Sequence, residues 1–195
     1  MGELVPIVEG RSEVEAVPVL LRRVLRRLKR FDLAIGRPVR VPRSKVVKPA
    51  ELAKALALAT RTRPHCRAIL VVLDADDDCP RELGPDLKAK AAASVGCPVE
   101  VILAKREFEA WFLGSVESLR GYRGIGADAA SPPDVETIRG AKERLTSLML
   151  GGRTYLPIDD QPAMAERFDM DRAAANSPSF RRLLEKVQRL LAELT

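Results

Sequence analysis

The feature that most constrains the fold is an apolar run, AILVVL at residues 68–73, that ends directly in Asp74. A run of this length, rich in β-branched residues and bounded by polar positions, is typical of a strand buried on both faces. Such strands belong to parallel sheets, because helices then cover both faces of the sheet. Two further apolar runs and one weaker run predict three more strands, at residues 3–8, 99–104 and 38–41.

Helical patterns alternate with these strands. Apolar residues recur at three- and four-residue spacing in residues 12–30, where Ser12 and Glu15 match a capping box. The order βαβαβαβα predicts an α/β fold: a mostly parallel four-stranded sheet with helices on both faces, in a Rossmann-like arrangement. The other helical patterns lie at residues 49–62, 80–93 and 106–119.

The character of the sequence changes at about Gly121. Gly, Pro and Asp punctuate residues 121–134, and helical patterns follow near 135–149 and 178–193. We expect residues 1–120 to form the α/β domain, and residues 121–195 to form a helical C-terminal appendage packed on it.

Composition is typical of a folded protein, since hydrophobic residues make up 46% and charged residues 31%. No apolar stretch approaches the ~20 residues needed to cross a bilayer, and the first ten residues do not resemble a secretion signal. We therefore expect a soluble, cytoplasmic protein. The net charge is +6, with basic clusters at residues 22–30 and 37–48. Such clusters favour a polyanionic partner, although a solvated helix face explains them equally well.

The Cys and His content disfavours zinc chemistry. Cys66, Cys79 and Cys97 form no CxxC pair, so neither a disulfide framework nor a zinc site follows from their spacing. The one histidine, His65, precedes the strand at 68–73, at the end away from the aspartates. A metal bound by this chain should therefore be hard and carboxylate-bound, which means Mg²⁺ or Mn²⁺.

Acidic residues follow two of the predicted strands. In an open parallel sheet, functional groups collect beyond the carboxyl ends of the strands. Glu9 leaves the first strand and Asp74 leaves the third, so both are expected at one edge of the sheet. Alternation along an extended backbone would point Asp74 and Asp76 the same way, and with Glu9 they would make an oxygen site for Mg²⁺. Glu9 alone is explained equally well as the exposed end of a strand.

Other acids near these strand ends have structural explanations as well. Glu13 lies in the first turn of a predicted helix, where the helix dipole favours an acid. Asp78 is a candidate cap for the helix that follows it. Glu107 and Glu109 come after the fourth strand, beside Lys105, and with Asp78 they make a candidate additional site. Two acids that open a helix are nevertheless common without any function.

Several catalytic motifs are missing from the sequence. It contains no GxSxG nucleophile elbow, no GxxxxGK[ST] phosphate loop and no GxGxxG fingerprint. Hydrolase-triad, P-loop and dinucleotide-binding functions are therefore disfavoured.

The chain resembles the Toprim proteins, in which one strand ends in Glu-Gly and a later strand ends in Asp-x-Asp. The matching segments are VEGRSE at residues 8–13 and LDADDD at residues 73–78. The chain is also similar to a bacterial family called domain of unknown function four-two-seven-six. That family is regarded as Toprim-like and related to the nucleases of the overcoming-lysogenisation-defect group. The motifs that identify it best are REFEAWFLGSVESLRG at 106–121, DQPAM at 160–164 and SPSFRRLLEKV at 177–187.

The resemblance implies a role for each acid of the motif. By the Toprim pattern, Glu9 is the general acid/base, and Asp74 and Asp76 hold Mg²⁺ or Mn²⁺. Glu13 matches the second acid of the nuclease-type variant and is expected to bind a metal as well.

The resemblance also implies hydrolysis rather than strand passage. Topoisomerases in this group use a nucleophilic tyrosine. The two tyrosines here, Tyr122 and Tyr155, lie in the predicted appendage, away from the expected site.

We therefore expect a Mg-dependent nuclease or phosphodiesterase that acts on nucleic acid. The basic residues at 22–30 lie at the end of a helix that should face away from the site, whereas the segment at 37–48 is better placed to hold a nucleic-acid backbone. The alternative is a non-catalytic Toprim-like partner or regulator, beside an ATPase in a defence-type or DNA-processing system, an association implied by resemblance alone. The expected nucleic-acid contacts are Arg11, Arg40, Arg43, Lys45 and Lys48.

Overall fold

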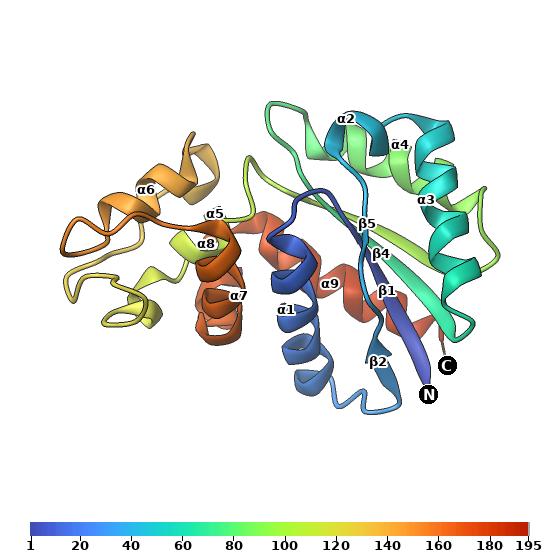
Figure 1. The fold of residues 1–195 in the computed structure, drawn as a ribbon, viewed down its shortest axis with the longest axis horizontal. Coiled ribbons are helices and arrows are strands. Elements are labelled where there is room, and N and C mark those ends of the chain that lie inside the picture. The colour runs from blue at the N-terminus through green and yellow to red at the C-terminus, as the bar shows by residue number, and fades with distance from the viewer. Residues whose placement is uncertain (195) are drawn as a thin grey trace.

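The computed structural model describes residues 1–194 and is built around one open parallel sheet (Figure 1). Four of the five strands within residues 1–194 have the order β2-β1-β4-β5, and the fifth, β3, pairs with β1 beyond the end of β2. All the described strand pairs are parallel, which confirms the predicted α/β fold. The short β2 was not predicted, because three residues carry no periodic pattern. The strands are β1 (Gly2–Val8), β2 (Leu33–Ile35), β3 (Val39–Arg40), β4 (Cys66–Asp74) and β5 (Val99–Ala104).

Alternation along β4 divides the core into two apolar layers. Ile69 and Val71 belong to the layer on one face of the sheet, and Leu70 and Val72 to the layer on the other. The six residues at 68–73 are all buried, as the apolar run predicts. Burial on both faces stabilises the central strands and fixes where β1 and β4 end.

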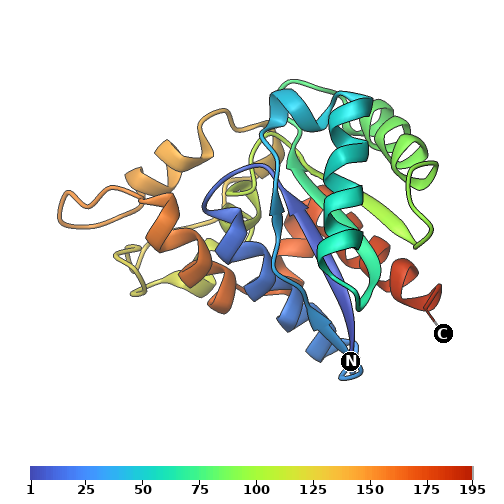
Figure 2. The same cartoon turned by 45° about the vertical axis from the view of Figure 1, so that its right-hand side comes forward.

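Helices cover both faces of the sheet (Figure 2). One layer contains α1 and α9, and the other contains α3 and α4. The bounds of α3, α4 and α9 agree with the predicted helices to within a residue. Within residues 1–194, no helix is long and apolar enough to span a bilayer. The bounds are α1 (Glu13–Arg27), α2 (Arg43–Val46), α3 (Pro49–Thr62), α4 (Pro80–Ala92) and α9 (Pro178–Ala192).

The predicted capping box at Ser12 and Glu15 is wrong. Ser12 has helical backbone angles, φ −68° and ψ −36°, and its side chain makes no capping hydrogen bond. The first helical residue is Glu13, whose buried side chain folds back over Gly10. A Cβ on Gly10 would lie 2.0 Å from Oε2 of Glu13, so only glycine leaves room for this carboxylate. Glu13 is thereby held against the end of β1.

The predicted helix at 106–119 is wrong in extent. Arg106 has a left-handed φ of 66°, so the chain leaves β5 through a tight turn. One helical turn follows, α5 (Ala110–Leu113), and then a 3₁₀ turn, η1 (Val116–Leu119). The aromatic residues of this segment form one buried cluster with two later ones: Phe108, Trp111, Phe112, Phe168 and Phe180.

Short helices fill the chain between η1 and α9. The predicted helix near 135–149 is interrupted at Gly140, whose φ of 70° is left-handed. Two of the later helices were not predicted, because they are short and Pro162 conceals the pattern of one of them. In chain order the elements are η2 (Val135–Thr137), α6 (Ala141–Ser147), α7 (Pro157–Arg167) and α8 (Met170–Asn176).

α1 packs between the sheet and the C-terminal helices and connects them (Figure 1). Arg23 of α1 donates hydrogen bonds at 2.8 Å to the carbonyl oxygens of Ala165 and Phe168. Arg30 donates at 2.8 Å to the carbonyl oxygen of Leu191. These two basic residues of the cluster at 22–30 therefore hold the fold together.

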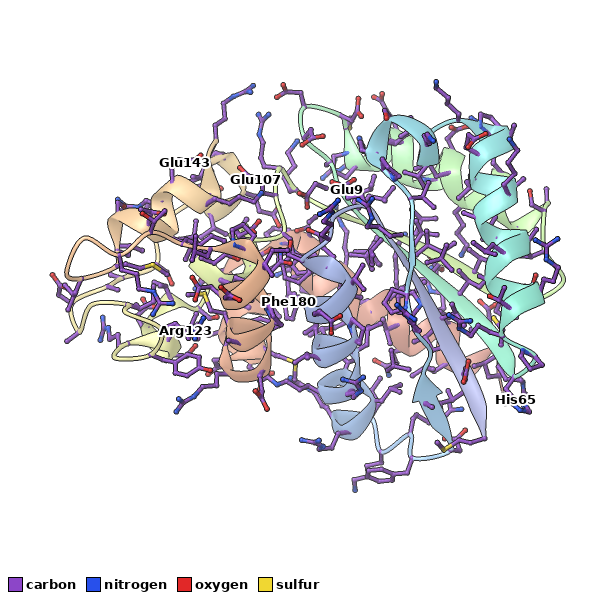
Figure 3. All side chains as sticks on the ribbon, in the orientation of Figure 1. Glu9, His65, Glu107, Arg123, Glu143 and Phe180 are labelled. Atoms are coloured by element: carbon purple, nitrogen blue, oxygen red, sulfur yellow. The ribbon has the colours of Figure 1, made fainter. Side chains whose placement is uncertain are left out.

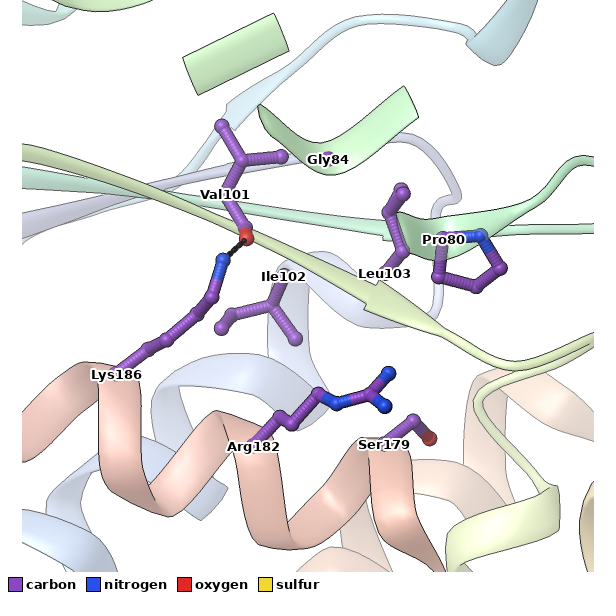
Figure 4. Close-up of a pocket in the computed structure, with 8 residues that line it drawn as sticks. All are labelled: Pro80, Gly84, Val101, Ile102, Leu103, Ser179, Arg182 and Lys186. Atoms are coloured by element: carbon purple, nitrogen blue, oxygen red, sulfur yellow. Dashed lines mark hydrogen bonds between the residues drawn. The ribbon is translucent and has the colours of Figure 1, made fainter. Parts of the chain in front are cut away.

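β5 is an edge strand, and α9 protects its free edge. Lys186 donates a hydrogen bond at 2.8 Å to the carbonyl oxygen of Val101 (Figure 4). Lys88 and Lys186 also pair with the buried carboxylate of Glu100. The hollow between β5, α4 and α9 has a volume of about 30 Å³, room for little more than a water molecule, so we regard it as a packing gap.

Candidate active site

Acidic side chains gather where β1 and β4 end. Figure 3 shows Glu9 and Glu107 at this end of the molecule and His65 at the opposite end. β1 and β4 are neighbours, with Val8 beside Val72, so Glu9 and Asp74 leave the sheet at one edge. We call the buried or partly buried carboxylates at this edge the acidic rim: Glu9, Glu13, Asp74 and Glu109.

Asp74 is oriented by the chain that follows β5. Its Oδ1 accepts a hydrogen bond at 2.8 Å from the backbone N–H of Phe108. Burial raises the pKa of Asp74 well above its usual value, and the three other rim carboxylates raise it further. Negative charge is therefore in excess around this side chain.

Glu9 titrates near neutral pH. Burial, together with the charge of Glu13, raises the pKa of Glu9 from 4.5 to about 7, against the opposing charge of Arg43. Its Oε2 is buried, and no group in residues 1–194 donates a hydrogen bond to it. A carboxyl group of this kind exchanges a proton readily at physiological pH.

Gln161 of α7 joins two of the rim acids. Its Nε2 donates a hydrogen bond at 3.1 Å to Oε1 of Glu109 and lies 3.5 Å from Oε1 of Glu13. Glu109 and Gln161 are both fully buried, and burial raises the pKa of Glu109. Oε2 of Glu13 and Oε2 of Glu109 are buried and receive no hydrogen bond from the described part of the chain.

Tyr155 also reaches the rim, so the expectation that neither tyrosine lies near the site is wrong. The segment before α7 folds back, and the Tyr155 hydroxyl donates a hydrogen bond at 3.1 Å to Oε1 of Glu109. Burial, with the charge of Glu109, raises the pKa of Tyr155, and its side chain is only 4% exposed. A buried, neutral phenol acts here as a hydrogen-bond donor rather than as a nucleophile.

Lys142 of α6 places a positive charge beside the rim. Its Nζ lies 2.9 Å from Oε2 of Glu107 and 3.4 Å from Oε2 of Glu109, the longer contact without hydrogen-bond geometry. Burial lowers the pKa of Lys142, but the two carboxylates outweigh burial and raise it. Burial alone would raise the pKa of Glu107. Lys142 and the N–H of Ala141, which donates at 3.0 Å, outweigh burial and lower this pKa. Glu107 therefore anchors α6, whereas Glu109 belongs to the rim.

Sequence reasoning missed three of these side chains: Lys142, Tyr155 and Gln161. Their hydrogen bonds to Glu107 or Glu109 span 35, 46 and 52 residues, so no local pattern marks Lys142 or Tyr155. Gln161 lies in the DQPAM segment, which was the available signal. Its neighbour Asp160 is structural, because it accepts hydrogen bonds from two arginines and from the N–H of Leu156.

Asp76 does not point with Asp74, so the predicted common direction is wrong. β4 ends at Asp74, and Asp76 has a left-handed φ of 48°, so strand alternation does not extend to it. Its side chain is 62% exposed and lies 3.8 Å from Nε of Arg43. Asp78 pairs with the same arginine at 2.5 Å and does not cap α4. Because Asp76 still raises the pKa of Glu9, it lies near the rim, on its outer side.

The other predicted contacts surround the rim. The N–H of Val41 bonds to the carbonyl oxygen of Val8, so β3 and α2 leave the sheet at the same end as Glu9. Lys105 contributes its backbone N–H, which donates at 3.2 Å to Oγ of Ser179. Of the candidate nucleic-acid contacts, one is partly buried, Arg43, and four are exposed: Arg11, Arg40, Lys45 and Lys48.

The donor set of the rim fits a hard divalent cation. The buried rim oxygens without a hydrogen bond from residues 1–194 are carboxylate oxygens of Glu9, Glu13 and Glu109, which are the donors that Mg²⁺ prefers, and the amide oxygen of Gln161 beside them is unpaired as well. Among the residues that the structure describes, no three Asp, Glu, His or Cys side chains form a ready-made metal site. Mg²⁺ is usually held by one or two carboxylates together with waters and substrate phosphates. The rim therefore fits an ion whose shell is completed by water and substrate.

Fold and site define a class: an open parallel α/β domain with a cluster of carboxylates beyond the strand ends. The chain belongs to the family described as domain of unknown function (DUF4276), whose model matches residues 8–188 and so includes every rim residue. This match confirms the resemblance to that family. No curated protein and no solved structure matches the chain.

Proposed function

We propose that this protein is a Mg²⁺- or Mn²⁺-dependent phosphodiester hydrolase that acts on nucleic acid, in the manner of the Toprim nucleases. The observation that carries the proposal is the surplus of negative charge at the acidic rim, where the pKa values of Glu9, Asp74 and Glu109 are all raised. Buried carboxylates that repel one another destabilise a fold unless a cation joins them. Perturbed acids at the carboxyl ends of parallel strands are typical of functional sites.

Asp74 and Glu13 are the residues that would hold the metal, with Glu109 and Asp76 beside them and water completing the shell. A divalent ion bound there would withdraw charge from a phosphate and lower the pKa of a water molecule. The hydrogen bond from Phe108 fixes the direction of the Asp74 carboxylate.

Glu109 is held in place by neutral donors. Gln161 and Tyr155 both donate to its Oε1, which leaves Oε2 facing Lys142 without a hydrogen bond. Neutral donors orient a carboxylate without cancelling its charge, so the four rim carboxylates still outnumber the two cations near them, Lys142 and Arg43, and the rim stays negative.

Glu9 is the residue that would move a proton. With a pKa of about 7, it accepts or donates a proton near neutral pH, where a general acid/base is most effective. Water is the attacking group in this proposal, since the Tyr155 hydroxyl is committed to Glu109.

The surroundings of the rim suit a polyanionic substrate. Exposed basic side chains contact phosphates and position a strand without reading its sequence. We place the reaction in the cytoplasm, and the resemblance adds an ATPase as a partner. The exposed basic residues are Arg11, Arg40, Lys45 and Lys48.

A cleavage assay tests the proposal. Labelled single- and double-stranded DNA and RNA are incubated with the purified protein in Mg²⁺, Mn²⁺ or a chelator. We expect metal-dependent cleavage that Glu9→Gln reduces by about 10²–10⁴-fold. Glu15→Gln, at an exposed acid of the neighbouring helix α1, is the matched control and should keep full activity. Cleavage that survives in Glu9→Gln would indicate a contaminant and count against the proposal.

A second candidate is a non-catalytic partner or regulator with a Toprim-like shell. It is favoured by one observation, that the described residues contain no ready-made group of three metal ligands. Asp74→Asn separates the two functions. In a hydrolase this variant loses Mg²⁺ binding and turnover while its stability is kept or increased. In a regulator it leaves partner binding unchanged.

A further inference from the structure

A charged hollow lies beside the acidic rim. Its volume of about 160 Å³ is many times the ~10–15 Å³ that a cavity needs to hold one water molecule, which leaves room for a tetrahedral oxyanion. Arg106 and Arg139 line it, together with Glu107, which Figure 3 places at the rim end of the molecule. Arg106 follows β5 and Arg139 precedes α6, so the hollow joins two separate segments of the chain.

A single carboxylate, that of Asp77, pairs with both arginines. Oδ1 of Asp77 pairs with Nη1 of Arg106 and, at 2.7 Å, with Nη2 of Arg139. Two guanidinium groups share this single acid, so the arginine pair carries one positive charge more than Asp77 neutralises. The side chain of Asp77 is 70% exposed, whereas that of Arg106 is only 22% exposed. An ion pair to an exposed acid contributes little to stability, so another anion displaces Asp77 easily.

The backbone holds the hollow in a preformed shape. Arg106 and Asp76 both have left-handed φ angles, 66° and 48°. The N–H of Asp76 donates at 3.1 Å to the carbonyl oxygen of Arg106, and Nη1 of Arg106 donates at 3.4 Å to the carbonyl oxygen of Asp76. Nε of Arg106 is buried and has no acceptor within residues 1–194. Strained backbone that is fixed in this way is concentrated at ligand sites.

The two remaining acids of the wall are already paired. Oε1 of Glu107 accepts from the N–H of Ala141 at 3.0 Å, and Oε2 accepts from Lys142 at 2.9 Å. Asp76 lies 3.8 Å from Nε of Arg43. An anion that enters the hollow therefore meets the two arginines, with Glu107 occupied by its own donors and Asp76, which shares Arg43 with Asp78, as the least neutralised acid of the wall.

We propose that Arg106 and Arg139 form a phosphate subsite for a backbone phosphodiester neighbouring the one at the acidic rim, and that Asp77 fills this subsite until substrate displaces it. This inference rests on the proposed function for its ligand, a nucleic-acid strand. Two guanidinium groups bind phosphate oxygens through charge-assisted hydrogen bonds. The subsite positions the strand and takes no part in breaking the bond.

Binding without cleavage tests the subsite. Fluorescence anisotropy of a labelled single-stranded oligonucleotide, in a chelator, measures affinity when metal-dependent hydrolysis is blocked. We expect Arg139→Ala to weaken binding about tenfold and to reduce the salt dependence by about one phosphate contact. Arg139 is 70% exposed, so the variant should fold, which thermal unfolding checks. Arg189→Ala, at an exposed arginine of α9, removes the same charge and should change the affinity by less than about twofold.

The reverse change is expected at Asp77. Asp77→Asn empties the subsite and should tighten binding about two- to fivefold, the equilibrium effect of one exposed ion pair. Asp171→Asn is the matched control, because Asp171 is 77% exposed and pairs with Arg27 at 2.5 Å. It changes the net charge equally and should leave the affinity unchanged.

The outcomes separate the subsite from the hydrolase. Equal oligonucleotide binding by the wild type and Arg139→Ala, or no binding by either, overturns the subsite. A nucleoside monophosphate that competes as tightly as the oligonucleotide overturns the assignment to a backbone phosphodiester. The expected binding changes without cleavage in any metal overturn the hydrolase and support the subsite, while cleavage with unaltered binding does the opposite.

Discussion

The side-chain amide of Gln161 donates a hydrogen bond at 3.1 Å to Oε1 of Glu109, inside a cluster of buried acids. Gln161 lies on α7, and Glu109 directly precedes α5, so this bond joins a late helix to the carboxyl edge of the sheet. The amide is neutral and satisfies a carboxylate oxygen without cancelling its charge. The C-terminal helices therefore complete the acidic rim as well as covering it.

Gln161→Glu should destabilise the metal-free protein by about 2 kcal/mol at pH 8, because a buried donor is lost and a like charge is added. Denaturant unfolding in a chelator measures the difference, and added Mg²⁺ should recover part of the loss. Gln188→Glu, at an exposed glutamine of α9, is the matched control and should have little effect. Equal stability of the two variants would contradict a place for Gln161 in the cluster.

The sheet and the helices beside it could be predicted because their patterns are local. The apolar run at 68–73 indicates a strand that is buried on both faces of the sheet. Pro49 indicates the first turn of a helix, and α3 begins there. Glu9 and Asp74 follow from the same reasoning, since Glu9 comes directly after β1 and Asp74 is the last residue of β4. Patterns of this kind fix which residues leave the sheet and at which edge.

The rest of the site depends on contacts that no local pattern records. Gln161 reaches Glu109 across 52 residues, and Lys142 reaches Glu107 across 35. Asp76 was misplaced for a different reason: strand alternation was carried two residues past the end of β4, into a left-handed turn. Tertiary packing decides which side chains reach the acidic rim. The sequence therefore predicts where the rim lies better than it predicts which residues form it.

Glu9→Gln should stabilise the metal-free protein at alkaline pH. The pKa of Glu9 is raised from 4.5 to about 7, so the folded state binds this proton more tightly than the unfolded chain. Its contribution to stability is present below pH 4.5 and is lost as the pH rises through 7. At pH 8 the ionised carboxylate then destabilises the fold by about 1–2 kcal/mol, after allowance for solvent screening.

The measurement is the difference in free energy of unfolding between Glu9→Gln and the wild type, in a chelator, from pH 4 to pH 8. The difference should be close to zero at the acid end and favour the variant at the alkaline end. Glu15→Gln, at an exposed acid of α1, should show no such trend. A difference that is independent of pH would contradict the raised pKa.

Lys142→Met should lower the stability of the fold more than the exposure of Lys142 suggests. Lys142 is 39% exposed, but it faces Glu107 and the fully buried Glu109, which would be left without a positive partner. We expect a loss of about 2–3 kcal/mol at pH 8, since removing one partner of a buried pair strands the other. Lys90→Met is the matched control: Lys90 is 40% exposed and pairs with the exposed Asp86, so its loss should be below about 1 kcal/mol. Denaturant unfolding measures both losses of stability. Similar losses for the two variants would show that Lys142 takes part in an ordinary surface ion pair.

Gly10→Ala should remove Glu13 from the rim while keeping the fold. The new Cβ would lie 2.0 Å from Oε2 of Glu13, but this oxygen is the end of a flexible side chain that can rotate away. We expect a small loss of stability, below about 1 kcal/mol, with a fall of about tenfold or more in Mg²⁺ or Mn²⁺ affinity measured by calorimetry. Gly96→Ala is the control, because its Cβ would meet nothing within 4 Å. In a Glu13→Ala background, Gly10→Ala should have no further effect on affinity, since both changes act through the same carboxylate. Additive losses in the double variant would place the effect of Gly10 elsewhere, and an unchanged affinity in Gly10→Ala would exclude Glu13 as a metal ligand.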